Sequence, residues 1–367
     1  MTRYKLSEIC KIVSGSTPKT NVPEYWDGEN VWITPAEITD KTFIVSDSQR
    51  KLSNLGVEKT HLSSFPKGTV ILSSRAPIGK VAIAGVEMFC NQGFKNLICS
   101  EKIMNEYLYW FLKGKTKYLN SLGRGATFKE LSAKIIGNIE LEVPSIQEQK
   151  EVVIRLRKID QIIGVFEREV ELLDELIKAR FVEMFGDPVS NSKDLPIQKM
   201  NDIAPICQYK GSFEGDVWLL NLDMVESQSG RIINHNIVHI DEVGGSVCTF
   251  DENNILYSKL RPYLNKVVIP DGKGYATSEL VPLLPNNKII NRIYLAYFLR
   301  SNEFVEMIKE KVAGAKMPRV SMNDFREFNV PIPPLELQNQ FASFVQEVDK
   351  SRLLSNHSLF LIKSITF

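Results

Sequence analysis

The feature that most constrains the fold of this 367-residue chain is an internal repeat. Segments of similar sequence follow one another in the same order in both halves: VWI at 31–33 and VWL at 217–219, RAPIGKV at 75–81 and RPYLNKV at 261–267, YLYWFL at 107–112 and YLAYFL at 294–299. Each half then ends with a proline that a glutamine follows five residues later, Pro144 with Gln149 and Pro333 with Gln338. Several matches in one order indicate two copies of one structural unit.

Each copy combines predicted strands with predicted helices. Short runs of β-branched and aromatic residues, bounded by Gly, Pro and Asn, are typical of strands and occur at 68–72, 81–84, 254–257 and 266–269. Apolar residues at helical spacing predict one helix over 106–117 and another over 292–311. Trp32 and Trp218 hold matching positions in apolar runs and are expected in the core. The sequence therefore predicts an α+β fold with two similar domains.

A long helix with a heptad stripe is predicted between the two copies. Ser145 and Glu148 form a capping-box pattern that predicts the start of the helix, and Gly186 predicts its end. Apolar residues alternate at spacings of four and three along it: Val152, Leu156, Ile159, Ile163, Phe166, Val170, Leu173 and Ile177. A helix over 146–184 would be about 60 Å long. Its stripe needs a partner helix to shield it from water.

The expected partner is the helix predicted after Pro334. Its seam positions are Phe341, Val345, Val348, Leu359 and Ile362, with Arg352 and Ser355 as polar interruptions. Because each helix follows its own domain, an antiparallel coiled coil within the chain is favoured over a stripe that is merely the core of a helical bundle. The predicted organisation is a first domain over 1–145, a central helix over 146–187, a second domain over 188–334 and a distal helix over 335–367.

Charge and composition restrict the classes of partner. The net charge is only +1, but residues 1–145 carry 19 Lys and Arg against 14 Asp and Glu, which is compatible with local patches that bind DNA. The five cysteines form no CxxC pair and show no ligand spacing with the four histidines, so reduced thiols and no metal site are expected. The sequence has no apolar run of membrane-spanning length and no secretory signal, which favours a cytoplasmic protein.

The motifs of several enzyme classes are missing from the sequence. There is no GxGxxG, FxGxG or GxxxxGK[ST], so neither a dinucleotide site nor an ATP site is expected. There is no Asn/Asp-Pro-Pro-aromatic motif of an amino-methyltransferase. The nuclease alternative at Pro270 and Asp271 lacks a nearby (D/E)xK, and a Pro-Asp-Gly turn explains these residues better. The chain is therefore expected to be non-catalytic by itself and to hold no cofactor.

Together these features resemble the specificity subunits of type I restriction–modification enzymes. The resemblance rests on the two similar halves, each closed by a (V/I)P-x-x-x-x-Q step into a helix. It also rests on four shorter segments: VSGSTP at 13–18, SSRAPIG at 73–79, NQGFK at 91–95 and MFGDP at 184–188. These segments extend over most of the chain.

The resemblance implies a function in DNA recognition. Each domain would be a target-recognition domain that reads one half of an asymmetric, bipartite site in double-stranded DNA. The antiparallel helices would set the unread spacer between the halves. Two methyltransferase subunits would dock on the chain, and restriction subunits with translocase and nuclease activity would join them. S-adenosylmethionine, ATP and Mg would belong to these partners.

Loop residues whose side chains can contact base edges or phosphates are the candidates for DNA binding. In the first half they are Thr17, Lys19, Ser74, Arg75, Lys80, Asn91, Gln92, Lys95, Arg124 and Lys129. In the second half they are Tyr209, Lys210, Lys259, Arg261, Lys266, Ser278, Lys316 and Arg319. Arg75 and Arg261 stand out because they occupy matching positions of the repeat.

Each of these assignments has a structural alternative. The two matched arginines could instead brace their loops by binding carbonyls, Lys80 and Lys266 could be solvated strand ends, and Asn91 and Gln92 could cap a turn. At the level of function, the alternatives are a coiled-coil scaffold that binds protein and has no DNA specificity, and a fusion that carries methyltransferase or nuclease activity.

Overall fold

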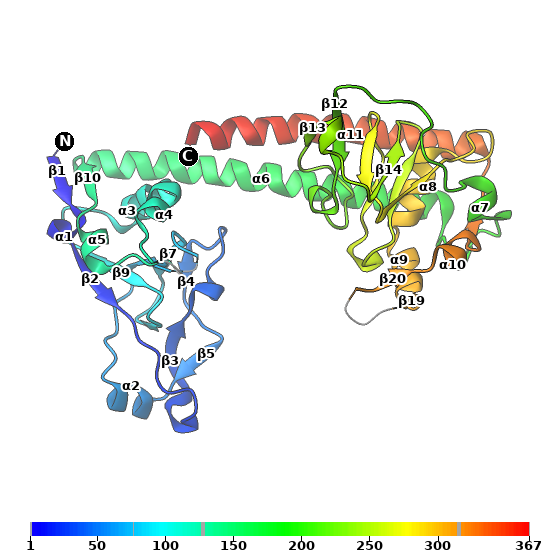
Figure 1. The fold of residues 1–367 in the computed structure, drawn as a ribbon. Helices are drawn as coiled ribbons and strands as arrows, with labels where there is room; N and C mark the ends of the chain where they lie inside the picture. Colours follow the sequence, from blue (N-terminus) through cyan, green and yellow to red (C-terminus); the bar gives the residue numbers. More distant parts are fainter. Residues whose placement is uncertain (1, 76, 126–128, 314–316, 367) are drawn as a thin grey trace. The chain divides into compact units, whose positions relative to one another are not determined.

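The computed structural model describes residues 2–75, 77–125, 129–313 and 317–366. The chain forms two compact units, one made of Met1–Phe166 with Ser358–Phe367 and the other of Glu167–His357. Figure 1 labels many of the helices and strands of both.

The first unit is built on two small sheets. The larger has the strand order β2-β9-β6-β7-β4, with β2 at Cys10–Ser14, β9 at Lys95–Cys99, β6 at Val70–Leu72, β7 at Val81–Ala84 and β4 at Ile44–Val45. The smaller has the order β5-β3-β8, with β5 at Arg50–Leu52, β3 at Trp26–Ile33 and β8 at Phe89–Cys90. Every residue of β6 and β7 is buried, which explains why these strands are continuously apolar.

Short helices and a strand pair complete the first unit. Strand β1 at Thr2–Lys5 pairs antiparallel with β10 at Glu140–Val143. The helices are α1 at Leu6–Ile9, α2 at Asn54–Thr60, α3 at Asn105–Lys113, α4 at Thr116–Leu122 and α5 at Ala133–Gly137. Helix α3 buries Leu108, Tyr109 and Leu112 in the same core as strands β6 and β7.

The second unit is similar but differs in the number of strands in its sheets. Its first sheet has the order β13-β12-β17-β14, with β13 at Ile237–His239, β12 at Asp216–Leu220, β17 at Gly274–Thr277 and β14 at Val247–Phe250. Its second sheet has the order β16-β15-β18, with β16 at Val267–Val268, β15 at Ile255–Ser258 and β18 at Leu280–Leu283. Two strand pairs are also present: β11 at Ile197–Lys199 with β21 at Asn329–Pro331, and β19 at Val312–Ala313 with β20 at Arg319–Val320.

The helices of the second unit follow the same order as those of the first, except that α2 has no counterpart among the described residues. They are α7 at Met200–Ile203, α8 at Arg292–Arg300, α9 at Asn302–Lys309 and α10 at Met322–Arg326. The strand pairings also correspond, because β3 pairs in parallel with β8 as β12 does with β17. The predicted α+β fold with two similar domains is thereby confirmed. Trp32 and Trp218 are both buried, as expected.

Two predicted helices are each divided in the structure. The helix expected over 106–117 is α3 followed by α4, and Gly114 caps the end of α3. The helix expected over 292–311 is α8 followed by α9. Ser301 separates them in extended conformation, and its hydroxyl accepts a hydrogen bond from the N–H of Phe304. A serine that caps a helix interrupts the preceding one without disturbing the apolar periodicity, so spacing alone could not reveal the break.

Two long helices follow the two copies, α6 at Ile146–Phe185 and α11 at Leu335–Thr366. The predicted capping box of α6 is present: the N–H of Ser145 donates to Glu148 over 2.9 Å, and the N–H of Glu148 donates to the Ser145 hydroxyl over 3.3 Å. Gly186 ends α6 with a φ of +73°, a left-handed conformation that suits glycine. The Lys193 ammonium donates to the backbone carbonyl of Glu183, in the last turn of α6, over 2.6 Å.

In the second unit, the end of α6 and the beginning of α11 pack against each other. The rings of Phe181 and Phe341 lie 5.4 Å apart, and Arg352 forms an ion pair with Asp174 at 2.5 Å. Phe181 follows Asp174 along α6, whereas Phe341 precedes Arg352 along α11, so the helices are antiparallel. This confirms the predicted antiparallel pairing within this unit.

The apolar stripe of α6 is shielded by the domain cores as well as by a helix. Leu156 packs against the core of the first unit. Leu173 and Ile177 belong with Phe341 and Val345 to the core of the second. Ile163 and Val348 are also buried, and the remaining seam residues are half-buried: Val152, Ile159, Phe166, Val170, Leu359 and Ile362. Among the described helices, none is both long and apolar enough to cross a membrane.

Candidate nucleic-acid interface

Three segments of the first unit meet at Ser74. The N–H of Ser74 donates to the carbonyl of Gly93 over 2.8 Å, and the N–H of Leu131 donates to the carbonyl of Ser74, also over 2.8 Å. We call this three-segment contact the first junction. It connects the loop that follows β6, the turn that precedes β9 and the segment before α5, so residues far apart in the sequence come together.

The first junction gathers basic side chains around one carboxylate. The backbones of Arg75 and Arg124 both form β-bridges with Glu130. Atom Oε2 of Glu130 lies 3.9 Å from a guanidinium nitrogen of Arg75, and Oε1 lies 3.6 Å from Nζ of Lys95. Predicted DNA-binding residues from three segments therefore share one acidic neighbour.

The second unit has an equivalent contact at Lys259, which we call the second junction. The N–H of Lys259 donates to the carbonyl of Glu279 over 3.0 Å, and the N–H of Val320 donates to the carbonyl of Lys259 over 3.0 Å. The exposed Arg261 is held nearby, since its N–H donates to the carbonyl of Pro318 over 2.8 Å. The backbone pattern of the first junction thus recurs with different side chains.

An arginine and a carboxylate dominate the electrostatics of the second junction. Two nitrogens of Arg319 bind the carboxylate of Glu279, at 2.7 Å for the shortest contact. The hydrogen bond from Arg319 and its positive charge lower the pKa of Glu279 below the ordinary glutamate value. Glu279 therefore stays ionised and holds the guanidinium in place.

Several predicted DNA-binding side chains make hydrogen bonds within the fold. Ser74 is fully buried and its hydroxyl donates to Gly93 over 3.1 Å. The ammonium of Lys80 donates to the carbonyl of Pro35 over 2.9 Å, and that of Lys266 donates to Leu222 over 2.6 Å. Both lysines thus hold the 3-10 turn after the first strand of a small sheet, at η2 (Pro35–Glu37) and η3 (Leu222–Met224). Neither lysine is a solvated strand end, because each ammonium bonds a carbonyl about 45 residues away.

The contacts of Asn91, but not those of Gln92, support the alternative that these side chains cap a turn. The Asn91 side chain accepts a hydrogen bond from the N–H of Gly93 over 2.9 Å, which closes the turn. The Thr17 hydroxyl bonds Gln92, and this contact brings the loop after β2 to the same turn. Lys95 is buried beside Glu130, so its charge is largely satisfied within the protein.

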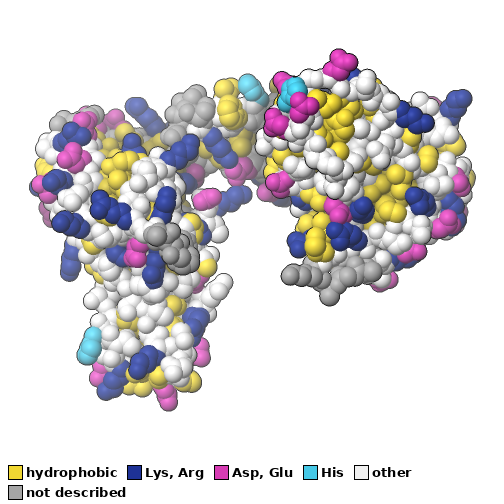
Figure 2. All heavy atoms as spheres, viewed as in Figure 1, with side chains coloured by type: hydrophobic (Ala, Val, Ile, Leu, Met, Phe, Trp, Pro, Cys, Tyr) yellow, Lys and Arg dark blue, Asp and Glu magenta, His cyan; other side chains and the backbone are white. Residues whose placement is uncertain are grey.

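The remaining candidates differ in exposure and position. Lys19, Arg124, Lys129, Lys210, Ser278 and Arg319 are exposed, while Arg75, Tyr209 and Lys259 are half-buried. Tyr209 and Lys210 lie in the segment beside β14, where the Tyr209 N–H donates to Thr249 over 3.3 Å. Lys316 lies outside the described residues. Figure 2 shows Lys and Arg side chains on the visible face of each unit with Asp and Glu among them.

Sequence reasoning missed the two carboxylates at the junctions. Carboxylates accept hydrogen bonds, so a criterion based on groups that donate to DNA does not identify Glu130 and Glu279. The repeat offered a weak signal for Glu130 only. Glu130 directly precedes Leu131 as the predicted DNA-binding residue Arg319 precedes Val320, so the two hold equivalent positions. An acidic residue in one copy thus corresponds to a basic residue in the other. The described residues include no group of three or more His, Cys, Asp or Glu that could hold a metal ion.

Comparisons with known proteins agree with the duplicated architecture. The sequence profile of the type I restriction modification DNA specificity domain matches residues 1–172 and 223–362. The chain is 26% identical over 388 residues to the type I restriction enzyme MjaIX specificity subunit of Methanocaldococcus jannaschii, covering 98% of this chain and 89% of that protein.

Two solved structures have a similar fold. One belongs to a study of complex assembly and conformational transition of the type I R-M system, with a TM-score of 0.62 and 15% identity over 100% of this chain and 95% of that one. The other is the S subunit of a type I restriction-modification system from M. genitalium, with a TM-score of 0.51 and 14% identity over 100% of this chain and 93% of that one.

Proposed function

Because this chain belongs to the type I restriction modification DNA specificity family, we propose that its first and second junctions are the centres of two DNA-reading surfaces. The chain is a non-catalytic DNA specificity subunit with two domains. Each domain reads one half of an asymmetric bipartite site in double-stranded DNA. The protein-binding scaffold has no support among the relatives.

The observation that carries this proposal is the recurrence of the junction. In both copies the same pair of backbone hydrogen bonds joins three segments at one residue, Ser74 or Lys259. An exposed or half-buried arginine follows within two residues, Arg75 in the first copy and Arg261 in the second. The side chains around them differ, as Glu130 and Arg319 illustrate. A common frame with different donors and acceptors suits two domains that recognise different base sequences.

The helices and the partners complete the proposal. Helices α6 and α11 set the number of unread base pairs between the half-sites, because a helix resists bending where a flexible linker would not. Two methyltransferase subunits bind the chain, and restriction subunits join the assembly. These partners supply S-adenosylmethionine, ATP and Mg, and the assembly acts on DNA in the cytoplasm. The sequence motifs for binding S-adenosylmethionine or ATP are missing from this chain, which supports that division of work.

A selection experiment tests the proposal. The full chain, assembled with its methyltransferase subunits, is incubated with a pool of randomised DNA duplexes, and the bound fraction is sequenced. We expect two short preferred blocks separated by a fixed number of base pairs without preference. Arg75→Ala should alter one block and Arg261→Ala the other, each by about 1–3 kcal/mol of discrimination at the affected position.

Two surface substitutions serve as controls for the arginine variants. Arg3→Ala removes an exposed arginine that pairs with Glu140, and Lys288→Ala removes an exposed lysine of the second unit. Neither should change a block. Binding without base preference, or the same block altered by both junction variants, would contradict the proposed function.

A further inference from the structure

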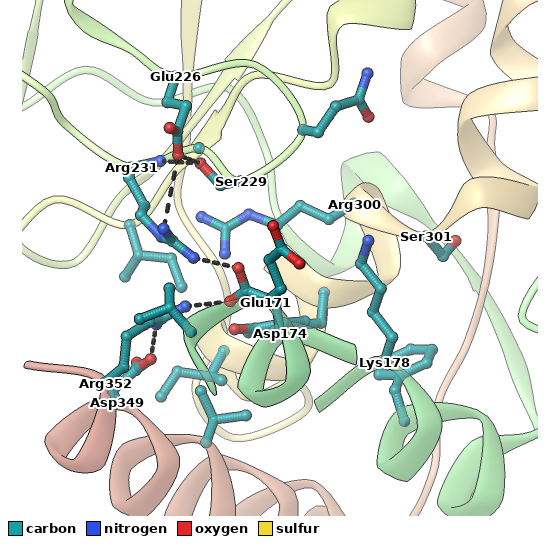
Figure 3. A pocket seen from close by; sticks show the side chains of 18 of the residues that line it. Glu171, Asp174, Lys178, Glu226, Ser229, Arg231, Arg300, Ser301, Asp349 and Arg352 are labelled. Atoms are coloured by element: carbon teal, nitrogen blue, oxygen red, sulfur yellow. Dashed lines mark hydrogen bonds and ion pairs between the residues drawn. The ribbon is translucent and has the colours of Figure 1, made fainter. Parts of the chain in front are cut away.

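A cluster of charged side chains lines a cavity of about 800 Å³ in the second unit, away from the second junction. Residues of α6, of α11 and of the loop between η3 and β13 contribute to it. Figure 3 shows the guanidinium groups of Arg231 and Arg352 directed toward the carboxylate on α6. Both arginines pair with this one carboxylate, which argues that the contact positions the segments that carry them.

Asp174 on α6 is the shared member of these pairs. Its Oδ1 lies 2.5 Å from Nη1 of Arg352 on α11, and its Oδ2 binds Nη2 of Arg231 in the loop. About a third of the Asp174 and Arg231 side chains is exposed, and 15% of the Arg352 side chain. One partly buried carboxylate therefore ties two helices and a loop together, and its removal would leave two arginines without their common partner.

The loop that carries Arg231 is a tight hairpin. Its closing bonds run from the N–H of Glu226 to the carbonyl of Arg231 over 2.8 Å and from the N–H of Gly230 to the carbonyl of Glu226 over 3.1 Å. Gly230 has a φ of +67°, and a Cβ there would lie 1.8 Å from the carbonyl oxygen of Val267. The hairpin thus lies directly against Val267, where the loop after β15 enters β16.

That neighbouring loop, residues 261–267, is the one that carries Arg261. The N–H of Gln228 donates to the carbonyl of Leu264 over 2.9 Å, and its side-chain amide donates to the carbonyl of Tyr263 over 3.1 Å. The N–H of Leu264 in turn donates to the carbonyl of Arg261 over 2.9 Å. The Asp174–Arg231 ion pair, the backbone of the short hairpin and these hydrogen bonds therefore connect Asp174 with the backbone of Arg261.

We propose that Asp174 is a positioning residue that fixes the 226–231 hairpin on the helix pair and thereby aims the 261–267 loop at its half of the DNA site. This inference rests on the proposed function. It assigns to a residue of α6, with no predicted DNA contact, a role in the specificity of the second half-site only.

The first domain contacts α6 through other pairs. Arg157 of α6 lies 2.7 Å from Glu106, and Asp160 of α6 lies 3.7 Å from Lys113. These contacts do not involve Asp174. The two half-sites should therefore respond differently to a change at Asp174.

The selection experiment with randomised duplexes tests this inference through Asp174→Asn and Arg231→Gln in the full chain with its methyltransferase subunits. Both variants should weaken the preference for the Arg261-dependent block by roughly 2- to 30-fold and leave the Arg75-dependent block unchanged. Arg231→Lys retains a positive charge toward Asp174 and should restore most of the preference. Arg231→Gln leaves the Asp174–Arg352 pair intact, so it provides the test if Asp174→Asn fails to fold.

Glu175→Gln is the matched control, because Glu175 is the neighbouring acidic residue on α6 and its exposed side chain pairs only weakly with Arg168 at 3.7 Å. It should leave both blocks as in the wild type. If folded Asp174→Asn and Arg231→Gln proteins keep both blocks, or lose both equally, the inference is wrong. If the wild type selects no blocks at all, the proposed function itself fails, and the two failures are thereby distinguished.

Discussion

Gln149 and Gln338 make the same three hydrogen bonds in the two copies of the repeat. The side-chain oxygen of Gln149 accepts from the N–H of Met104 over 2.8 Å, and that of Gln338 accepts from Asn291 over 2.7 Å. The Gln149 amide donates to Lys102 and Pro144, both at 3.0 Å. The Gln338 amide donates to Ile289 at 3.2 Å and to Pro333 at 2.7 Å.

These glutamines explain why a proline is followed by a glutamine five residues later in each half. Each glutamine is completely buried in the first turns of its long helix and satisfies backbone groups just before α3 in the first unit or α8 in the second. The repeated sequence pattern is therefore a joint between domain and helix. It fixes the direction in which each helix leaves its domain.

Replacing either glutamine by alanine should destabilise its own unit. The change removes the partner of one backbone N–H and two backbone carbonyls, which costs about 1–3 kcal/mol for each of these groups that is left buried and unsatisfied. Urea unfolding of the full chain, with probes in each unit, measures the free energy. Gln149→Ala should lower the stability of the first unit and Gln338→Ala that of the second.

Neighbouring glutamines provide matched controls. Gln147 and Gln340 are exposed on the same helices, so Gln147→Ala and Gln340→Ala should change the free energy of unfolding by less than about 0.5 kcal/mol. An equal loss for the buried and exposed glutamines would mean that the joint contributes nothing beyond helix composition.

Much of the fold could be predicted because its signals are local or repeated. The capping box at Ser145, the terminal Gly186 and the heptad spacing of α6 act within a few residues of each other, so the sequence displays them directly. Because of the repeat, the sequence pattern of the domain occurs twice, and each copy supports the prediction made from the other. The division between α8 and α9 was missed because Ser301 changes one backbone conformation without changing the apolar spacing.

The candidate site was less predictable because it depends on contacts between distant segments. Residue type indicated that Lys80 and Ser74 can bind phosphate. It did not indicate that their side chains donate hydrogen bonds to the carbonyls of Pro35 and Gly93. Arg75 and Arg124 meet through Glu130, which no local pattern places beside them. Matching positions in the repeat were the better guide, since they identified both junction loops.

The buried face of α6 should be far more sensitive to truncation than its exposed face. Ile177 is 1% exposed within the core that contains Phe341, whereas the adjacent Leu176 is 48% exposed. Ile177→Ala should lower the free energy of unfolding by about 2–5 kcal/mol through lost burial and a cavity. Leu176→Ala should change it by less than about 1 kcal/mol, and urea unfolding compares the two. Similar losses at both positions would show that the heptad face is not what the second unit buries.

The acidity of Glu279 should depend on Arg319. Because the hydrogen bond from Arg319 lowers the pKa of Glu279 in the folded protein, the pair stabilises the fold at pH values above the ordinary glutamate pKa. This contribution is lost as the pH falls through the lowered pKa. Arg319→Gln should therefore raise the pKa of Glu279 toward the ordinary value.

Carbon-13 NMR of labelled glutamate carboxyl groups measures this change, with Glu279→Gln to assign the signal. Arg326→Gln is the control, since Arg326 binds Asn323 on its own helix. An unchanged Glu279 titration in Arg319→Gln would refute the ion pair at the second junction.

Two glycines of α6 and its C-terminus should respond to alanine in opposite directions. Gly164 lies within the helix, and a Cβ there would meet no atom within 4 Å, so Gly164→Ala should stabilise the chain by about 1 kcal/mol through helix propensity. Gly186 has a φ of +73°, and its Cβ would lie 2.3 Å from the Ser192 hydroxyl. Gly186→Ala should therefore cost about 1–2 kcal/mol. Thermal unfolding of both variants gives the signs directly, and a stabilising Gly186→Ala would contradict a left-handed end to the helix.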